Sequence, residues 1–275
     1  MARIKESIVA YQLADLLRVM ERLRDPETGC PWDVRQDFRS IVPSTLEECY
    51  ELAQAIEHED YPHVAEELGD VLFQVVFYAQ LGREQELFDF DGIVDGLVRK
   101  LLRRHPHVFL DGEIEGVVTE RASVEDVKHS WEAIKQDERH EKSLSGILAD
   151  VPVALPALPR AQKLQKRAAR VKFDWPDPQA VLAKLEEEIA ELRAALAADN
   201  AAAIAEEMGD ILFTGVNLAR KLGLDAESGL RHASAKFERR FTAMEGRVAA
   251  CGEHLADYTP QQLDALWESV KAQDS

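Results

Sequence analysis

Hydrophobic residues recur at helical spacing along most of the chain. The clearest amphipathic stretch covers residues 11–24, where one stripe holds Leu13, Leu16, Leu17, Met20 and Leu23. Residues 211–219, ILFTGVNLA, are apolar on nearly every side, and this pattern predicts a buried helix. Alternating β-branched runs and Asn-Gly hairpin turns, which indicate strands, are absent from the sequence. The pattern therefore predicts an all-α fold.

Acidic residues form two clusters on either side of a predicted turn at residues 199–200. The clusters are Glu187, Glu188 and Glu191 before the turn, and Glu207 and Asp210 after it. Good helix formers flank the turn, so the stretch predicts a helical hairpin. At a rise of 1.5 Å per residue, Glu191 and Glu207 both lie roughly 10 Å from the turn and come level on antiparallel helices. Glu188 and Asp210 come level in the same way, so four carboxylates converge.

Acidic runs on helices are usually solvated surface faces, and that interpretation competes here with a metal site. The apolar helix that follows Asp210 favours the metal site. Carboxylates beside a buried segment repel one another unless a proton or a cation neutralises them. Oxygen ligands without histidine or cysteine suit a hard cation, which means Mg²⁺ or Mn²⁺.

The same acidic pattern occurs earlier in the chain. Each residue of the earlier set lies 140 positions before its counterpart, and the set is Glu47, Glu48, Glu51, Glu67 and Asp70. Further along the spacing becomes 136, and Lys100, Arg103 and Arg104 match Lys236, Arg239 and Arg240. A repeat of this length indicates two copies of a whole domain. A solvated face has no reason to keep five acidic residues in register across both copies, so the repeat favours the metal site.

Prolines mark the boundary between the two copies. Residues 143–160 contain Pro152, Pro156 and Pro159, a density that interrupts helices. We therefore expect a first domain at 1–142, a linker at 143–160 and a second domain at 161–275.

Capping signals predict where the carboxylate helices begin. Ser44 precedes Glu47 by three residues, which predicts a capping box at the start of the first one. Pro62 is expected in the first turn of its partner helix. Asp177 followed by Pro178 predicts the start of the matching helix in the second copy.

A local group of basic residues opens the second domain: Arg160, Lys163, Lys166, Arg167 and Arg170. A solvated helix face is the ordinary interpretation for any single one of them. The functional alternative is that one or two of them contact phosphate.

The chain is strongly acidic, with 33 basic and 51 acidic residues and a net charge of −18. This charge argues against nucleic acid or an anionic membrane surface as a partner, because both require a basic surface. A small phosphorylated substrate is compatible, since bound cations neutralise it locally. No stretch approaches the ~20 apolar residues of a membrane span. We also expect no signal peptide at the N-terminus.

The cysteines are Cys30, Cys49 and Cys251, which form no CxxC pair and have no histidine at zinc spacing. The pattern argues against a disulfide framework and against a zinc site. It is typical of a protein in the reducing cytoplasm.

Several motifs together resemble the MazG family, which comprises two-domain nucleoside triphosphate pyrophosphohydrolases of bacteria. The motifs are the paired EExxE…ExxD pattern, CPWD at 30–33, RRHPHVF at 103–109 and KFERRF at 236–241. The acidic pattern alone would indicate only the wider all-α pyrophosphohydrolase superfamily. The resemblance covers nearly the whole chain and implies a homodimer of helical-bundle domains. Its implied activity is Mg²⁺-dependent hydrolysis of NTPs and dNTPs to monophosphate and pyrophosphate, in nucleotide-pool cleansing or stress-related nucleotide control.

The resemblance also implies roles for individual residues. Glu187 would orient or deprotonate water, and the cation ligands would be Glu188, Glu191, Glu207 and Asp210. The nucleotide would be contacted by Lys184, Lys236, Arg240 and Trp267. Bound Mg²⁺ would activate water and bridge phosphate oxygens. Lys236 and Arg240, four residues apart on one helical face, would offset charge on the departing pyrophosphate.

The two copies raise the question of which one is active. In relatives the second domain is the better attested catalyst, and the first is thought to be weak or structural. Here the first copy keeps the counterpart set Glu47, Glu48, Glu51, Glu67, Asp70, Lys100 and Arg104. Loss of cation ligands therefore does not explain a weak activity of the first domain. We expect the second domain to carry most of the turnover.

Two other functions compete with this one. A non-catalytic helical dimer that acts as a scaffold or regulatory partner is the stronger rival, and it predicts no release of phosphate from any nucleotide. A di-iron oxidoreductase would require Glu-x-x-His pairs on two helices, and neither acidic cluster has a histidine three residues on. Within the enzyme class, a single specific nucleotide or an alarmone stays open as the substrate.

Overall fold

The computed structural model describes residues 10–119, 122–127, 130–131, 134, 138 and 146–273. All regular elements over these residues are helices, and one isolated antiparallel bridge joins Phe109 to Val117. The all-α prediction is therefore confirmed. Among the described helices, none combines the length and the apolar run that crossing a bilayer would require.

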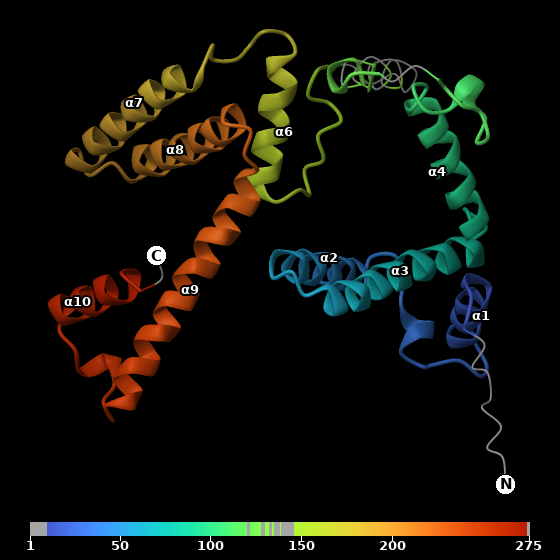
Figure 1. Ribbon diagram of the computed structural model, residues 1–275, viewed down its shortest axis with the longest axis horizontal. Helices are drawn as coiled ribbons and strands as arrows, with labels where there is room; N and C mark the ends of the chain where they lie inside the picture. Colours follow the sequence, from blue (N-terminus) through green and yellow to red (C-terminus); the bar gives the residue numbers. More distant parts are fainter. Residues whose placement is uncertain are drawn as a thin grey trace. The chain divides into compact units, whose positions relative to one another are not determined.

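The chain divides into two compact units, Met1–Glu138 and Arg139–Ser275, which we name the first and the second unit. Figure 1 labels their helices. The first unit contains α1 (Leu13–Leu23), η1 (Asp33–Arg35), α2 (Val42–Glu57), α3 (Tyr61–Glu84), α4 (Phe90–Arg104) and η2 (Leu110–Gly112). The second unit contains α6 (Ala157–Ala169), α7 (Pro178–Ala197), α8 (Ala201–Lys221), α9 (Ala226–Ala250), η3 (Leu255–Asp257) and α10 (Pro260–Lys271).

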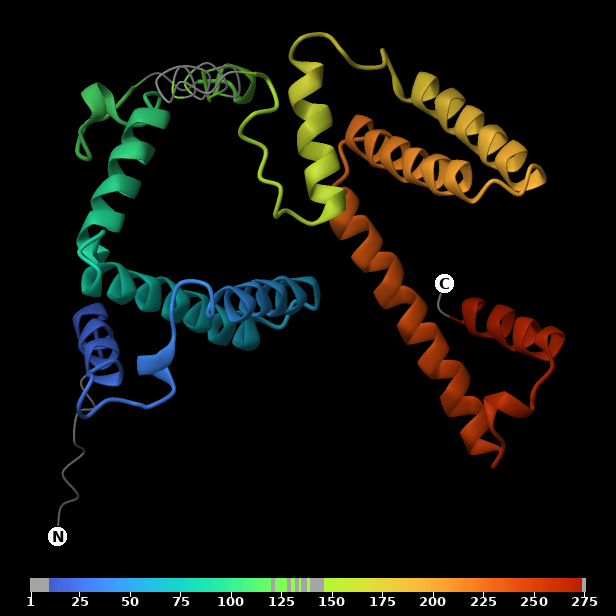
Figure 2. The same ribbon diagram turned by 180° about the vertical axis from the view of Figure 1, so that it is seen from behind.

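A helical hairpin dominates each unit, α2 with α3 in the first and α7 with α8 in the second (Figures 1 and 2). Both turns use the same geometry, since Glu59 and Asp199 adopt left-handed φ angles of 55° and 49°. The next residue then caps the second helix, because the side chains of Asp60 and Asn200 each accept a backbone N–H three residues on. The predicted hairpin and its turn at 199–200 are confirmed.

Two of the predicted helix starts are confirmed. The Asp177 side chain caps α7 by accepting the N–H of Ala180, and Pro178 is the first helical residue. Pro62 lies in the first turn of α3, where its missing N–H costs nothing.

The predicted capping box at Ser44 is wrong. Helix α2 begins at Val42, after Ile41, which makes no side-chain capping bond. Ser44 therefore lies inside the helix. Pro43 lies in the first turn, and its fixed φ favours a helix start there without a polar cap.

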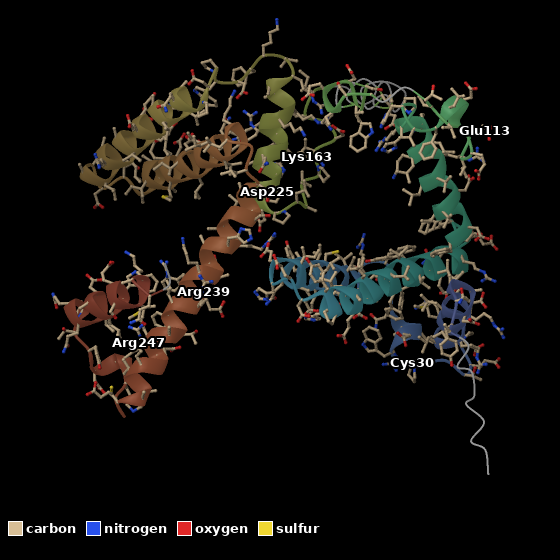
Figure 3. The ribbon with its side chains drawn as sticks, in the orientation of Figure 1. Cys30, Glu113, Lys163, Asp225, Arg239 and Arg247 are labelled. Carbon is tan, nitrogen blue, oxygen red and sulfur yellow. The ribbon has the colours of Figure 1, made fainter. Side chains whose placement is uncertain are left out.

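Each unit has its own apolar core. In the first unit Met20, Ile41, Val76, Phe77 and Leu81 form one buried cluster, so the amphipathic helix predicted at 11–24 packs through Met20. In the second unit α9 packs along α10, and the buried side chains of this contact region are Met244, Val248 and Val270. Arg247 strengthens this pairing by donating to Ser269 at 2.7 Å (Figure 3).

Helix α6 begins at Ala157, inside the segment predicted as a linker. Arg167, one of the candidates for phosphate contact, is buried and forms an ion pair with Asp150 at 2.6 Å. This pair ties part of the proline-rich segment to the second unit. The domain limits 1–142 and 161–275 stay a prediction.

The buried helix predicted after Asp210 is only half buried in the single chain. On α8, Val216 and Asn217 are buried, but Leu212 is 55% exposed and Phe213 is 41% exposed. The helix is apolar on several sides, and the described part of one chain covers only some of them.

Candidate metal and nucleotide site

Three carboxylates meet between α7 and α8 in the second unit. Glu188 comes from α7, and Glu207 and Asp210 come from one turn of α8. One oxygen of each lies within 4.8 Å of the others. Glu188 is buried, Glu207 is half-buried and Asp210 is exposed, so the cluster lies at the surface of the hairpin and is open on one side.

The electrostatics of the cluster favour a bound cation. Burial raises the pKa of Glu207, and the neighbouring charges of Glu191, Glu188 and Asp210 raise it further. A carboxyl with a raised pKa resists ionisation, and a divalent ion would remove that resistance by neutralising several carboxylates at once. The donor set consists only of oxygen, which fits a hard cation.

Lys184 lies at the edge of this cluster, one turn before Glu188 on α7. Its ammonium lies 2.8 Å from an oxygen of Glu187 and 2.9 Å from an oxygen of Glu188. The hydrogen bond with Glu187, followed by that with Glu188, raises the pKa of Lys184. The lysine therefore stays protonated and offsets part of the negative charge of Glu187 and Glu188.

The remaining acidic candidates stand slightly apart from the three-carboxylate cluster. Glu191 is exposed on α7, and its charge acts on Glu207. Glu187 is also exposed and is held by Lys184. The structure thus brings Glu188, Glu207 and Asp210 together, with Glu191 and Glu187 around them.

The structure places the other predicted nucleotide contacts on α9 and α10. Lys236 is exposed and Arg240 is half-buried on α9, while Trp267 of α10 packs against Phe237 with ring centroids 5.4 Å apart. Helix α9 leaves the hairpin beyond the end of α8, and Figure 3 labels Arg239, the neighbour of Arg240, on the part that has left it. Within the single chain the part of α9 around Arg239 therefore lies beyond the hairpin that carries the carboxylate cluster (Figure 3).

The first unit repeats the cluster with Glu48 from α2 and Glu67 and Asp70 from α3, again within 4.8 Å. Burial raises the pKa of Glu48, and the charges of Asp70 and Glu51 add to the effect. Glu51 and Glu47 thus surround the cluster as Glu191 and Glu187 do in the second unit.

A histidine distinguishes the first cluster from the second. His63 Nε2 lies 2.7 Å from one oxygen of Glu67, and the other oxygen of Glu67 is buried without a hydrogen-bond partner. The equivalent position in the second unit is Ala203. The sequence analysis did not predict this contact. The signal that could have found it is the difference between His63 and Ala203 at equivalent positions of the two copies.

The basic counterparts in the first unit lie on α4. Lys100 is half-buried, and Arg104 is bound to Glu138 at 2.5 Å. Arg103 binds the other oxygen of the same carboxylate at 2.5 Å. These two guanidinium groups, Arg104 first, lower the pKa of Glu138 to about 2, so Arg104 is engaged by a carboxylate that holds its charge.

Comparison with known proteins matches both hairpins. The profile of the MazG nucleotide pyrophosphohydrolase domain matches residues 36–109 and 177–243. The chain is 48% identical to the nucleoside triphosphate pyrophosphohydrolase of Escherichia coli K12, over 96% of this chain and 98% of that protein. It is 41% identical to the nucleoside triphosphate pyrophosphohydrolase/pyrophosphatase MazG of Thermotoga maritima, over 98% and 99%.

Among solved structures, a mazG-related protein from Thermotoga maritima aligns with 45% of this chain and 99% of its own, at 25% identity and a TM-score of 0.38. The two profile matches fall on the two hairpins that carry the carboxylate clusters, and the E. coli and T. maritima relatives extend over almost the entire sequence. The chain therefore belongs to the MazG family of nucleotide pyrophosphohydrolases.

Proposed function

We propose that this protein hydrolyses nucleoside triphosphates to nucleoside monophosphate and pyrophosphate in a Mg²⁺-dependent reaction at the second unit. The observation that carries the proposal is the convergence of Glu188, Glu207 and Asp210 in a family of nucleotide pyrophosphohydrolases. The names of the E. coli and T. maritima relatives support nucleoside triphosphates as the substrate.

The cation would be held by Glu188, Glu207 and Asp210, with Glu191 as the fourth ligand. Bound Mg²⁺ or Mn²⁺ would lower the pKa of a water molecule and neutralise phosphate oxygens. Glu187, exposed beside the cluster and oriented by Lys184, would accept the proton of the attacking water. Lys184 would contact the triphosphate, because its charged ammonium already lies at the open edge of the cluster.

The remaining residues would bind the substrate from α9 and α10. We assign Lys236 and Arg240 to the phosphates and Trp267 to the nucleotide. The full chain carries a net charge of −18, so such local cations are needed to let a triphosphate approach.

We further propose that the protein acts as a homodimer. In the second unit, large apolar side chains of the hairpin and of α9 are exposed, among them Leu212, Met208, Phe237 and Phe241. Exposed apolar side chains of this size are typical of an interface. The three cysteines are free, and a cytoplasmic location is the setting we propose.

Product analysis tests the activity directly. The protein is stripped of metal with a chelator, supplied with Mg²⁺ or left without it, and incubated with a panel of NTPs and dNTPs. Equimolar monophosphate and pyrophosphate that form only with Mg²⁺ are the expected result. Absence of turnover on every nucleotide would contradict the proposal and favour the non-catalytic scaffold.

A further inference from the structure

A histidine and a carboxylate meet beside the carboxylate cluster of the first unit. His63 and Glu67 lie one turn apart on α3, and the imidazole Nε2 is 2.7 Å from Oε1 of the carboxylate. The backbone N–H of His63 donates to the side chain of Asp60 at 3.3 Å, which holds the first turn of the helix in place. An ion that binds two donors at about 2.1 Å each, at a right angle, keeps them about 3 Å apart. The pair is therefore already spaced like two neighbouring ligands of one cation.

The carboxylate of this pair is buried and incompletely partnered. Glu67 is 5% exposed, and its Oε2 has no hydrogen-bond partner. Burial without a partner disfavours the charge of a carboxylate, and a cation bound to Oε1 would neutralise the whole group without touching Oε2. The side chain of His63 is 49% exposed, so the pair lies at the surface of the hairpin.

The register of the hairpin adds a third donor from α2. Glu51 lies eight residues before Glu59 at the turn, and Glu67 lies eight residues after it. Residues at equal distances from the turn come level on antiparallel helices, so the exposed Glu51 comes level with Glu67. This level is three residues, or about 4.5 Å, nearer to the turn than the level of Glu48 and Asp70. One imidazole nitrogen and two carboxylates thus gather on the turn side of the cluster.

The second unit lacks the nitrogen donor of this set. Ala203 stands at the position of His63 and has no polar side-chain atom. Its cluster is flanked instead by Lys184, whose protonated ammonium contacts Glu188 at 2.9 Å and has no lone pair to offer a metal. The cation ligands proposed for the second unit are therefore all oxygens, whereas the first unit has an imidazole beside its carboxylates.

We propose that His63, Glu67 and Glu51 form a site in the first unit for a divalent transition cation, which this site binds in preference to Mg²⁺. Imidazole nitrogen suits first-row transition metals, whereas Mg²⁺ prefers oxygen ligands and retains its waters. On binding, the ion replaces the proton that Nε2 donates to Glu67, and this proton passes to solvent. The inference shares with the proposed function the premise that the carboxylates bind cations, and it gives the first unit a different class of cation from the second.

The test uses the full-length chain without an affinity tag and detects the nitrogen ligand directly. Electron spin echo envelope modulation of bound Mn²⁺ shows whether an imidazole nitrogen coordinates the ion. Mn²⁺ is a stringent probe because it binds most weakly in the first-row series. Competition with excess Mg²⁺ then measures the preference of each site.

Three variants isolate the contribution of His63. His63→Gln keeps an N–H donor for Glu67 but removes the imidazole, so the local fold is retained. Ala203→His places an imidazole at the equivalent position of the second unit. His58→Ala is the matched control, because this exposed histidine caps the end of α2 about 10 Å along the helix from Glu51.

We expect nitrogen-coupled Mn²⁺ in the wild type and in His58→Ala, and no nitrogen coupling in His63→Gln. His63→Gln should raise the Kd for Mn²⁺ at this site at least about 10-fold and the Kd for Mg²⁺ less than about 2-fold. Ala203→His should add a second nitrogen-coupled ion. Excess Mg²⁺ should displace Mn²⁺ from the second unit of the wild type before it displaces the nitrogen-coupled ion.

Bound Mn²⁺ without nitrogen coupling in the wild type would overturn the inference and leave the proposed function intact. Nitrogen coupling that survives in His63→Gln would overturn it as well. Absence of bound Mn²⁺ from both units would refute the shared premise. Nitrogen-coupled Mn²⁺ in a wild-type protein that hydrolyses no nucleotide would refute the proposed activity alone.

Discussion

In the first unit one carboxylate oxygen of Glu67 contacts Nε2 of His63 at 2.7 Å. The matching Glu207 of the second unit has Ala203 in place of this histidine. In the second unit Lys184 binds Glu187 and Glu188, whereas Ser44 occupies its position in the first. In both units the three carboxylates offer oxygens within 4.8 Å of one another. The two units therefore keep the same three carboxylates but differ in which of them is buried, Glu67 in the first and Glu188 in the second, and in the side chains next to the cluster.

With this difference, the proposed cation site and the proposed nucleotide site would be separable parts of the same hairpin. The turns at Glu59 and Asp199 set the height at which the carboxylates meet, and they are alike. The groups that would receive a triphosphate are not. We therefore expect both clusters to bind a divalent cation and the second unit to carry the turnover.

Removal of one cluster carboxylate at a time gives the largest expected effect. Glu207→Gln should weaken cation binding at the second cluster at least about 100-fold, and Glu67→Gln should do the same at the first, because each removes a charged ligand. Titration of metal-free protein with Mn²⁺, followed by electron paramagnetic resonance, counts the sites. If Glu207→Gln leaves the number of tight sites unchanged, the second cluster is not a metal centre.

Replacing Lys184 with serine, the residue at this position in the first unit, tests whether the lysine beside the cluster contacts the triphosphate. Lys184→Ser should raise the KM for NTP about 10-fold through loss of a charge-assisted contact. Without nucleotide it should strengthen Mg²⁺ binding, because Glu188 no longer shares its charge with the lysine. Steady-state kinetics and Mg²⁺ titration measure the two effects. Arg193→Ser, an exposed change on the same helix, is the control. If both variants change the KM and the Mg²⁺ affinity equally, Lys184 does not contact the substrate.

The free energy of unfolding of the first unit should depend on acidic pH through the ion pairs of Glu138. Its pKa of about 2 lies below the usual value of 4.5, so its ion pairs stabilise the first unit fully above pH 4.5 and lose that contribution as the pH falls toward 2. Glu138→Gln should cost about 1–3 kcal/mol at pH 7. The gap between variant and wild type should narrow between pH 4.5 and 2. Urea unfolding across this range tests the prediction, and a gap that does not depend on pH would contradict it.

The hairpin turn of the first unit gives the smallest expected effect. Glu59 holds a φ of 55°, which costs a side-chain-bearing residue strain that glycine avoids. Glu59→Gly should stabilise the first unit by about 0.5–1 kcal/mol without changing NTP hydrolysis. Asp199→Gly should stabilise the second unit less, because aspartate tolerates this conformation better. Thermal unfolding measures both, and a loss of stability in Glu59→Gly would show that its side chain matters more than its backbone.

The hairpins and their carboxylates could be predicted from sequence because they depend on local spacing. The break at 199–200, the cap at Asp177 and the pairing of Glu188 with Asp210 follow from the helix period and from capping chemistry. The predicted start of α2 at Ser44 is wrong because the helix already begins at Val42, with Pro43 in its first turn. Such near-equivalent starts cannot be separated by local rules alone.

The rest depends on contacts between distant residues. Gln165 meets Phe213 across 48 positions of sequence, and Arg104 meets Glu138 across 34. No periodicity reports such pairs. The exposure of Leu212 and Phe213 likewise depends on which faces of α8 pack against another helix. An apolar sequence alone does not predict those packing partners.

We propose that turnover belongs to the second unit although both units keep the carboxylates. The most direct test compares Glu188→Gln with Glu48→Gln, the same change at equivalent positions, in Mg²⁺-dependent release of monophosphate and pyrophosphate from NTPs. We predict that Glu188→Gln lowers turnover at least about 100-fold, while Glu48→Gln keeps more than about half of the wild-type rate. Hydrolysis that survives Glu188→Gln and is lost in Glu48→Gln would contradict the account.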